Sequence, residues 1–172
     1  MITATSGKHE LFTALDEAVL QMQDLIAALD GDKINSIPYK DSWTAGQLVQ
    51  HVKKSISGMA KAMAMETKPA GRDVAERIPE LQKIFLDFSS KMQSPEFIIP
   101  EPGPYQKQSS IDELKNSLQQ FKAAAGNTDL DGLAEGLPFG PITKLEMLHF
   151  VLYHTQRHLN QLKKISGALG NK

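Results

Sequence analysis

The sequence TKLEMLHFVLYHTQRHLNQLKKISG occupies residues 143–167 and has the pattern of one long amphipathic helix. Its apolar residues recur every three or four positions, the spacing that gathers side chains on one face of an α-helix. A capping box opens the segment, because the Thr143 hydroxyl can accept a hydrogen bond from a free amide while Glu146 reaches back. The apolar stripe consists of Leu145, Leu148, Leu152, Leu159 and Leu162.

Three other segments have the same periodicity, at residues 8–29, 44–66 and 110–125. Two of them open with further capping boxes, at residues 44–47 and 110–113. Four helices that each carry one apolar face bury those faces most simply in a four-helix bundle. The sequence therefore predicts an all-α protein built as a four-helix bundle.

A long irregular insertion is expected after the second helix. A weaker helical pattern over residues 79–92 opens at Pro79, which the first turn of a helix tolerates. Residues 94–108 then contain four prolines and cannot form a regular helix. A loop of this length inside a compact domain is often functional. The insertion should therefore carry one short extra helix. No alternating pattern typical of a strand is evident anywhere in the chain, so no sheet is expected.

Composition limits the classes of function. The 172 residues suit one domain, residues 1–172, and contain no cysteine. This absence excludes disulfides, thiolate metal ligands and a cysteine nucleophile, and it fits a reducing compartment. The 19 basic and 20 acidic residues are mixed along the chain, without the basic stripe that nucleic-acid binding requires. No nucleic-acid partner is expected.

Membrane insertion and secretion are not expected either. No stretch approaches the ~20 apolar residues of a membrane-spanning helix. Residues 1–12 are polar and lack the apolar core of a secretory signal. The prediction is a cytoplasmic protein without a membrane partner.

Three histidines form a candidate metal site. His154 and His158 lie four residues apart, so they stack on one helical face about 6 Å from each other and can share one ion. His51, at the edge of the apolar stripe of the second helix, is the natural third ligand. Three neutral imidazoles with one open position suit zinc or nickel.

A simpler interpretation of these histidines stays open. A half-buried histidine such as His51 is often a hydrogen-bonded core residue, and a pair four apart can arise by chance. The other two histidines do not join the candidate site. His149 points to roughly the opposite side of its helix from His154 and should be a packing or surface residue. His9, in the first turn of the first helix, should be solvated.

Two segments together resemble a known family. WTAGQLVQH at residues 43–51 is similar to the second-helix signature of the DinB/YfiT-like metal-binding bundle superfamily, and HTQRHLNQ at residues 154–161 is similar to its last-helix signature. The resemblance covers most of the chain and implies a DinB-like bundle. The metal ligands that it implies are His51, His154 and His158.

The resemblance also suggests roles for neighbouring residues. Trp43 and Thr44 would anchor the start of the ligand-bearing helix, and Gln161 would lie beside a ligand or pack near it. Gln47 occupies a position where relatives often carry glutamate. This substitution removes one carboxylate from the neighbourhood of the site but does not remove a ligand.

Three functions remain open. Better-understood relatives are S-transferases that use small thiols such as bacillithiol or mycothiol, or isomerases that use mycothiol, so this chain is expected to take a small thiol cosubstrate. The end of the bundle and the Pro95–Pro104 segment would then select the electrophile. A metal-dependent hydrolase would need a general base, and Glu146 lies on a different face from His154. The third possibility is a bundle that binds metal or ligand without turnover. The apolar faces could also support a homodimer.

Overall fold

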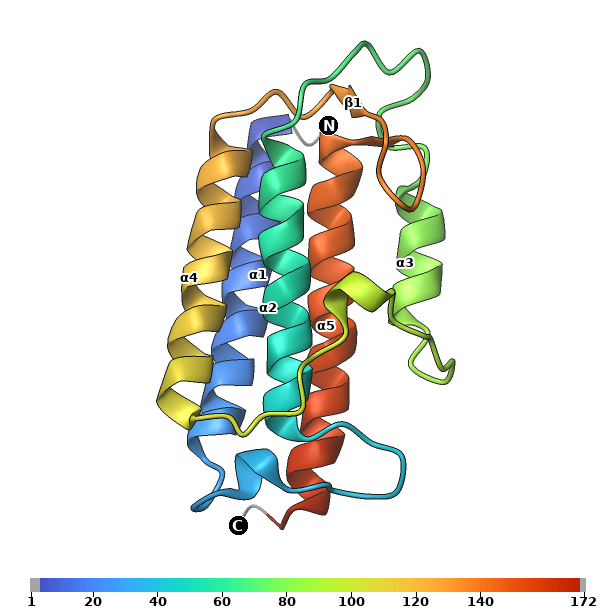
Figure 1. Cartoon of the computed structure of the whole chain (residues 1–172). Helices are drawn as coiled ribbons and strands as arrows, with labels where there is room; N and C mark the ends of the chain where they lie inside the picture. Colours follow the sequence, from blue (N-terminus) through green and yellow to red (C-terminus); the bar gives the residue numbers. More distant parts are fainter. Residues whose placement is uncertain (1–3, 171–172) are drawn as a thin grey trace.

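A computed structural model describes residues 4–170 of the chain. Four long helices lie side by side in it (Figure 1). They are α1 (Ala4–Ala27), α2 (Ala45–Met63), α4 (Lys107–Gly126) and α5 (Lys144–Ala168). The structure is predominantly helical, which confirms the predicted all-α class. Among the described residues, no helix is both long enough and apolar enough to cross a membrane.

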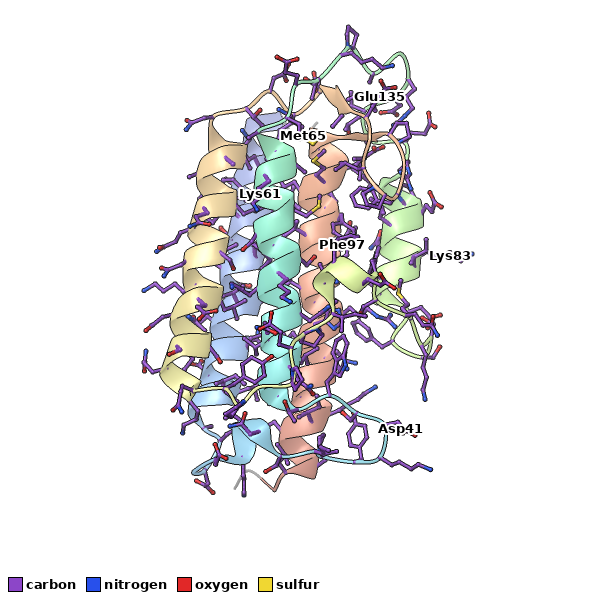
Figure 2. The ribbon with its side chains drawn as sticks, in the orientation of Figure 1. Asp41, Lys61, Met65, Lys83, Phe97 and Glu135 are labelled. Atoms are coloured by element: carbon purple, nitrogen blue, oxygen red, sulfur yellow. The ribbon has the colours of Figure 1, made fainter. Side chains whose placement is uncertain are left out.

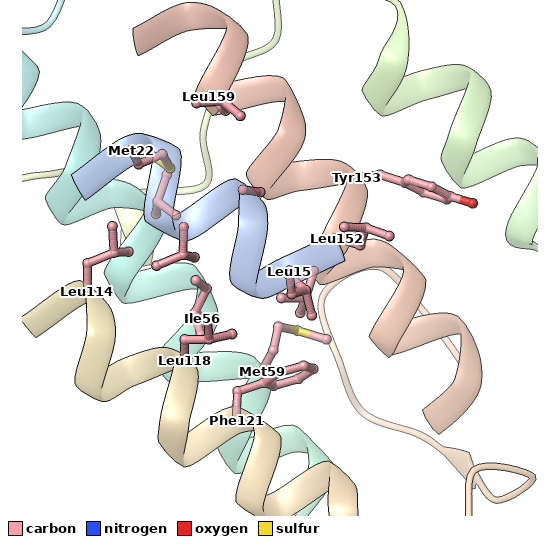
Figure 3. Packing of buried hydrophobic residues seen from close by; sticks show 14 of the residues in the cluster. Leu15, Met22, Ile56, Met59, Leu114, Leu118, Phe121, Leu152, Tyr153 and Leu159 are labelled. Carbon is pink, nitrogen blue, oxygen red and sulfur yellow. The ribbon is translucent and has the colours of Figure 1, made fainter. Parts of the chain in front are cut away.

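The four helices enclose one apolar core. Helices α1 and α2 each contact both α4 and α5, so α1 and α2 lie on a diagonal. Figure 3 shows side chains from all four helices pointing into the common interior. The predicted stripes account for most of this core. Fully buried members include Leu15, Met22, Leu48, Ile56, Leu114, Phe121, Leu148 and Leu162.

Two of the three predicted capping boxes are present. The Thr44 hydroxyl accepts from the Gln47 amide at 3.1 Å, and the Gln47 side chain accepts from the Thr44 amide at 3.0 Å. The same reciprocal bonds open α5 at Thr143. The capping box predicted at Ser110 is wrong, because α4 begins three residues earlier, at Lys107. The Ser110 amide already donates to the Gln106 carbonyl at 3.0 Å, as it does inside a helix.

The extra helix of the insertion is shorter than predicted. Helix α3 (Ile78–Leu86) packs alongside α5, outside the four long helices (Figure 1). The Asp87 carboxylate accepts from the Ser89 amide at 3.1 Å, and this local turn competes with continuation of the helix. Phe88 and Met92, predicted to lie on the helix, instead follow it and are exposed. Within residues 4–170 the helical elements also include two 3₁₀ turns, η1 (Lys33–Asn35) and η2 (Glu96–Ile98).

A small sheet corrects the expectation of no strands. Strand β1 (Leu133–Ala134) pairs antiparallel with β2 (Ile142–Thr143), and Lys68 bridges to Leu133 on the other side. Strands of two residues are too short to show an alternating pattern in the sequence. The sheet holds the chain immediately before α5, whose first turn follows β2 directly.

Candidate metal centre

The structure brings together the three histidines that the sequence indicated. His51 lies in the second turn of α2 and faces His154 and His158 on α5, and the three residues are 1%, 5% and 8% exposed. Their Nε2 atoms form a triangle with sides of 3.0, 3.2 and 3.3 Å. As predicted, His9 is exposed, and His149 packs half-buried with its Nδ1 3.2 Å from the Tyr153 hydroxyl.

Hydrogen bonds determine which nitrogen carries the proton in two of the rings. His51 Nδ1 lies 2.9 Å from the Ile98 carbonyl, which only accepts, so Nδ1 must hold the proton and donate it. His158 Nδ1 similarly donates to Gln161 Oε1 at 2.9 Å. The Nε2 atom of each ring therefore presents a lone pair. Gln161 contacts a candidate ligand, as the resemblance implied.

This arrangement suits a cation better than it suits a hydrogen-bonded core. Nε2 of His51 and Nε2 of His158 lie 3.0 Å apart with no proton available between them. A proton on Nε2 of His154 can be donated to Nε2 of either His51 or His158. It does not relieve the contact between His51 and His158. Zinc–nitrogen bonds of about 2.0–2.1 Å place two nitrogens of a tetrahedral site about 3.3 Å apart. The observed triangle is close to that size, so the three residues fit a divalent ion.

Burial keeps the three imidazoles in the form that binds a metal. Desolvation and, to a smaller extent, the neighbouring His51 lower the pKa of His158 to about 3, despite the raising effect of its hydrogen bond to Gln161. Desolvation also holds the pKa of His154 well below 6.5. The pKa of His51 is lowered by burial and partly restored by its bond to Ile98. All three rings are neutral at pH 7, as coordination requires.

Three aromatic rings lie next to the histidine triangle. The ring centroids of Trp43 and His51 lie 5.0 Å apart, so Trp43 contacts the site directly. The ring centroids of Phe85 of α3 and Phe150 of α5 lie 5.9 and 5.4 Å from the ring centroid of His154. They form one apolar wall of the site.

Arg157 ties the insertion to the helix that carries two of the histidines. Its guanidinium donates to the carbonyls of Phe85, Asp87 and Ser90, which lie at the end of α3 and just after it. Its charge also contributes to the lowered pKa values of His154 and His158. Sequence reasoning missed Arg157, although its place between the two histidines was a signal that could have identified it.

Glu146, considered as a general base, is not free to act as one. Its carboxylate is fully buried and pairs with both terminal nitrogens of Arg72 at 2.8 Å. It also accepts from the amides of Arg77 and Thr143, at 2.8 and 2.9 Å. Burial alone would raise the pKa of Glu146, but these hydrogen bonds outweigh it and the pKa is lowered. Glu146 holds the insertion against the start of α5.

Comparisons with known proteins agree with this architecture. The family model of the DinB superfamily matches residues 14–162, a range that includes all three histidines. An uncharacterized protein of Bacillus subtilis (strain 168), YuaE, is 23% identical over 153 residues, which cover 87% of this chain and 93% of that protein. No solved structure matches. Because the family model spans most of the chain, the protein belongs to the DinB superfamily.

Proposed function

We propose that the chain binds one divalent transition-metal ion, zinc or nickel, through Nε2 of His51, His154 and His158. The observation that carries this proposal is the 3.0 Å contact between two Nε2 atoms whose rings both hold their protons on Nδ1. A cation between these lone pairs replaces repulsion with coordination. Three protein ligands leave one position of a four-coordinate ion open for a small molecule.

The chemistry that we propose is transfer of a small thiol to an electrophile within the DinB-like four-helix bundle. When bound, the ion would lower the pKa of the thiol and supply thiolate at neutral pH. The thiolate sulfur would attack the electrophilic carbon, forming a C–S bond as the leaving group departs with its electron pair. The thiol proton goes to solvent. The chain has no cysteine, so this sulfur arrives with the cosubstrate.

Residues around the site support a thiolate and an apolar electrophile. The Arg157 cation contributes a positive field, and Phe85 and Phe150 provide an apolar wall. Phe97 of η2 is 63% exposed beside this region (Figure 2). These features favour thiol transfer over hydrolysis, since Glu146 is already bonded to four donors. A cytoplasmic location and a homodimer are part of the same proposal.

Elemental analysis tests the metal site first. The purified untagged protein should contain about one metal per chain, and His51→Ala, His154→Ala and His158→Ala should each lose it. His149→Ala, on the same helix but outside the triangle, is the matched control and should keep it. Absence of metal after reconstitution with zinc and nickel would leave three core histidines and overturn the proposal.

Thiol transfer is tested on the metal-loaded protein. Bacillithiol, mycothiol and glutathione are each mixed with a chromogenic aryl halide, and the rate of thioether formation is compared with buffer. A rate above buffer that disappears in His154→Ala supports the transferase. A fully loaded protein without turnover would instead indicate a non-catalytic metal-binding bundle.

A further inference from the structure

Residues 98–105, which we call the strap, run from the last residue of η2 toward α4 and cross the outer face of α2 (Figure 1). The first residue of the strap, Ile98, provides the carbonyl that accepts the Nδ1 proton of His51 at 2.9 Å. The last, Tyr105, is bound through its backbone to one side chain. Its amide donates to Asn35 Oδ1 at 2.7 Å, and its carbonyl accepts from Asn35 Nδ2 at 2.9 Å.

Gln50, the neighbour of His51 in the sequence, joins the middle of the strap to its end. Its Oε1 accepts from the Glu101 amide at 2.7 Å and lies 2.6 Å from the Tyr105 hydroxyl. That hydroxyl also reaches the Glu101 carbonyl. Gln50 Nε2 lies 3.4 Å from the Glu101 carboxylate. One side chain of α2 therefore holds the strap at two places.

Two further residues of α2 continue this contact at intervals of four. The Lys54 ammonium donates to the Ile99 carbonyl at 3.0 Å and lies 3.5 Å from the Glu101 carboxylate. At Gly46, an added Cβ would lie 2.7–2.8 Å from the Tyr105 side chain, so only glycine allows this approach. Gly46, Gln50 and Lys54 share one helical face. The strap follows that face.

We propose that the strap is the orienting element of the metal centre and that Gln50 is its main positioning residue. With the strap in place, the Ile98 carbonyl keeps the proton of His51 on Nδ1 and leaves Nε2 free for the ion. Without the strap, the ring can turn and the proton of the neutral imidazole can move from Nδ1 to Nε2. An Nε2 that carries a proton cannot coordinate the ion. The inference rests on the proposed metal site. Metal binding and order in the strap are then reciprocally linked.

Zinc affinity tests the role of Gln50. Competition with a chromophoric chelator should show about tenfold weaker binding in Gln50→Ala, the size of effect that residues supporting a ligand usually have. Gln23→Ala is the matched control, because the Gln23 side chain also links its helix to a distant backbone group, donating to the Ile111 carbonyl at 3.3 Å, but it has no hydrogen bond to the strap or the site. Gly46→Ala provides a second disturbance of the strap and should weaken zinc binding in the same direction. Circular dichroism checks that each variant is folded.

The tautomer of His51 is a readout that a merely structural role would not change. Long-range ¹H–¹⁵N spectra of the metal-free protein should show His51 protonated on Nδ1 in the wild type. They should show a mixture of Nδ1-H and Nε2-H forms in Gln50→Ala. In the wild type, zinc should also slow hydrogen exchange of the Glu101 amide, with the Ser110 amide inside α4 as the internal reference.

The outcomes separate this inference from the proposed function. If the wild type binds zinc and Gln50→Ala binds it equally well with an unchanged His51 tautomer, the strap has no orienting role and only this inference fails. If the wild type binds no metal, the metal proposal fails. The tautomer comparison then still decides whether the strap orients His51.

Discussion

The rings of His51 and His158 meet with their Nε2 atoms 3.0 Å apart, while each ring donates its Nδ1 proton to a carbonyl oxygen on its other side. One acceptor is the backbone of Ile98, in the long insertion, and the other is the side chain of Gln161, one turn along α5. The two lone pairs thus face each other in a buried space. The predictions below follow from this contact and from two other buried polar side chains of α5, Glu146 and Thr155.

Zinc should stabilise the folded protein without being required for folding. At a free zinc concentration 100 times its Kd, binding adds about 2.7 kcal/mol to the free energy of unfolding. For a chain of this size, that raises Tm by about 5–10 °C. Thermal unfolding with zinc and with EDTA measures the difference, and His154→Ala should show none. A metal-free protein that is unfolded at 25 °C would contradict the view that the apolar core supports the bundle.

The metal-free protein should lose stability as the pH falls below about 6.5. The buried histidines have lowered pKa values when folded, and that of His158 is about 3, whereas in the unfolded chain they titrate near 6.5. The unfolded state therefore binds more protons between these values, and stability rises with pH there. When the pH falls from 7 to 5, each fully buried histidine should lower the free energy of unfolding by about 2 kcal/mol.

Urea unfolding in EDTA at the two pH values measures this loss. His158→Ala should show a smaller difference between pH 7 and pH 5, because it has one buried histidine fewer. An equal or larger difference in the variant would mean that other groups cause the acid sensitivity.

Gln161→Leu should weaken zinc binding by about 10–100-fold, because the His158 ring loses the acceptor that holds its proton on Nδ1. Asn160→Ala, one position earlier on α5, is the matched control. Zinc titration of both variants gives the comparison. Equal affinity in Gln161→Leu and the wild type would show that the packing around His158 orients the ring unaided.

Glu146→Ala should destabilise the fold while leaving zinc stoichiometry unchanged. The substitution leaves Arg72 without its buried partner and the amides of Arg77 and Thr143 without an acceptor. We expect the free energy of unfolding to fall by about 3 kcal/mol. Chemical denaturation measures the loss. Because the pKa of Glu146 is lowered, its contribution is present above about pH 4.5 and disappears as the carboxylate protonates. Loss of metal in a folded variant would instead place Glu146 in the site.

Thr155→Val should stabilise the protein by about 1 kcal/mol. The Thr155 hydroxyl is fully buried and, among the described residues, has no hydrogen-bond partner. Valine has nearly the same shape and removes an unsatisfied polar group, which costs about 1–3 kcal/mol when buried. Chemical denaturation of the variant and the wild type checks the sign. Destabilisation would mean that the hydroxyl has a bound partner such as water.

The helices and the histidines were predictable because their signals are local. Apolar side chains three or four residues apart must share a helical face, and reciprocal caps at Thr44 and Thr143 mark where two helices begin. The same rule places His154 and His158 together, and His51 followed from its position beside an apolar stripe. Where a local turn competes with the helix, as at Asp87, periodicity alone overextended the prediction.

Contacts between distant parts of the chain could not be predicted in this way. The Ile98 carbonyl is 47 residues from His51, and Arg72 is 74 residues from Glu146. A backbone carbonyl has no signature in the sequence, because every residue carries one, and its direction depends on the path of the loop. The residue types that suit a metal were therefore readable from their spacing. The hydrogen bonds that orient them depend on where the strap crosses α2, and only the packed structure decides that path.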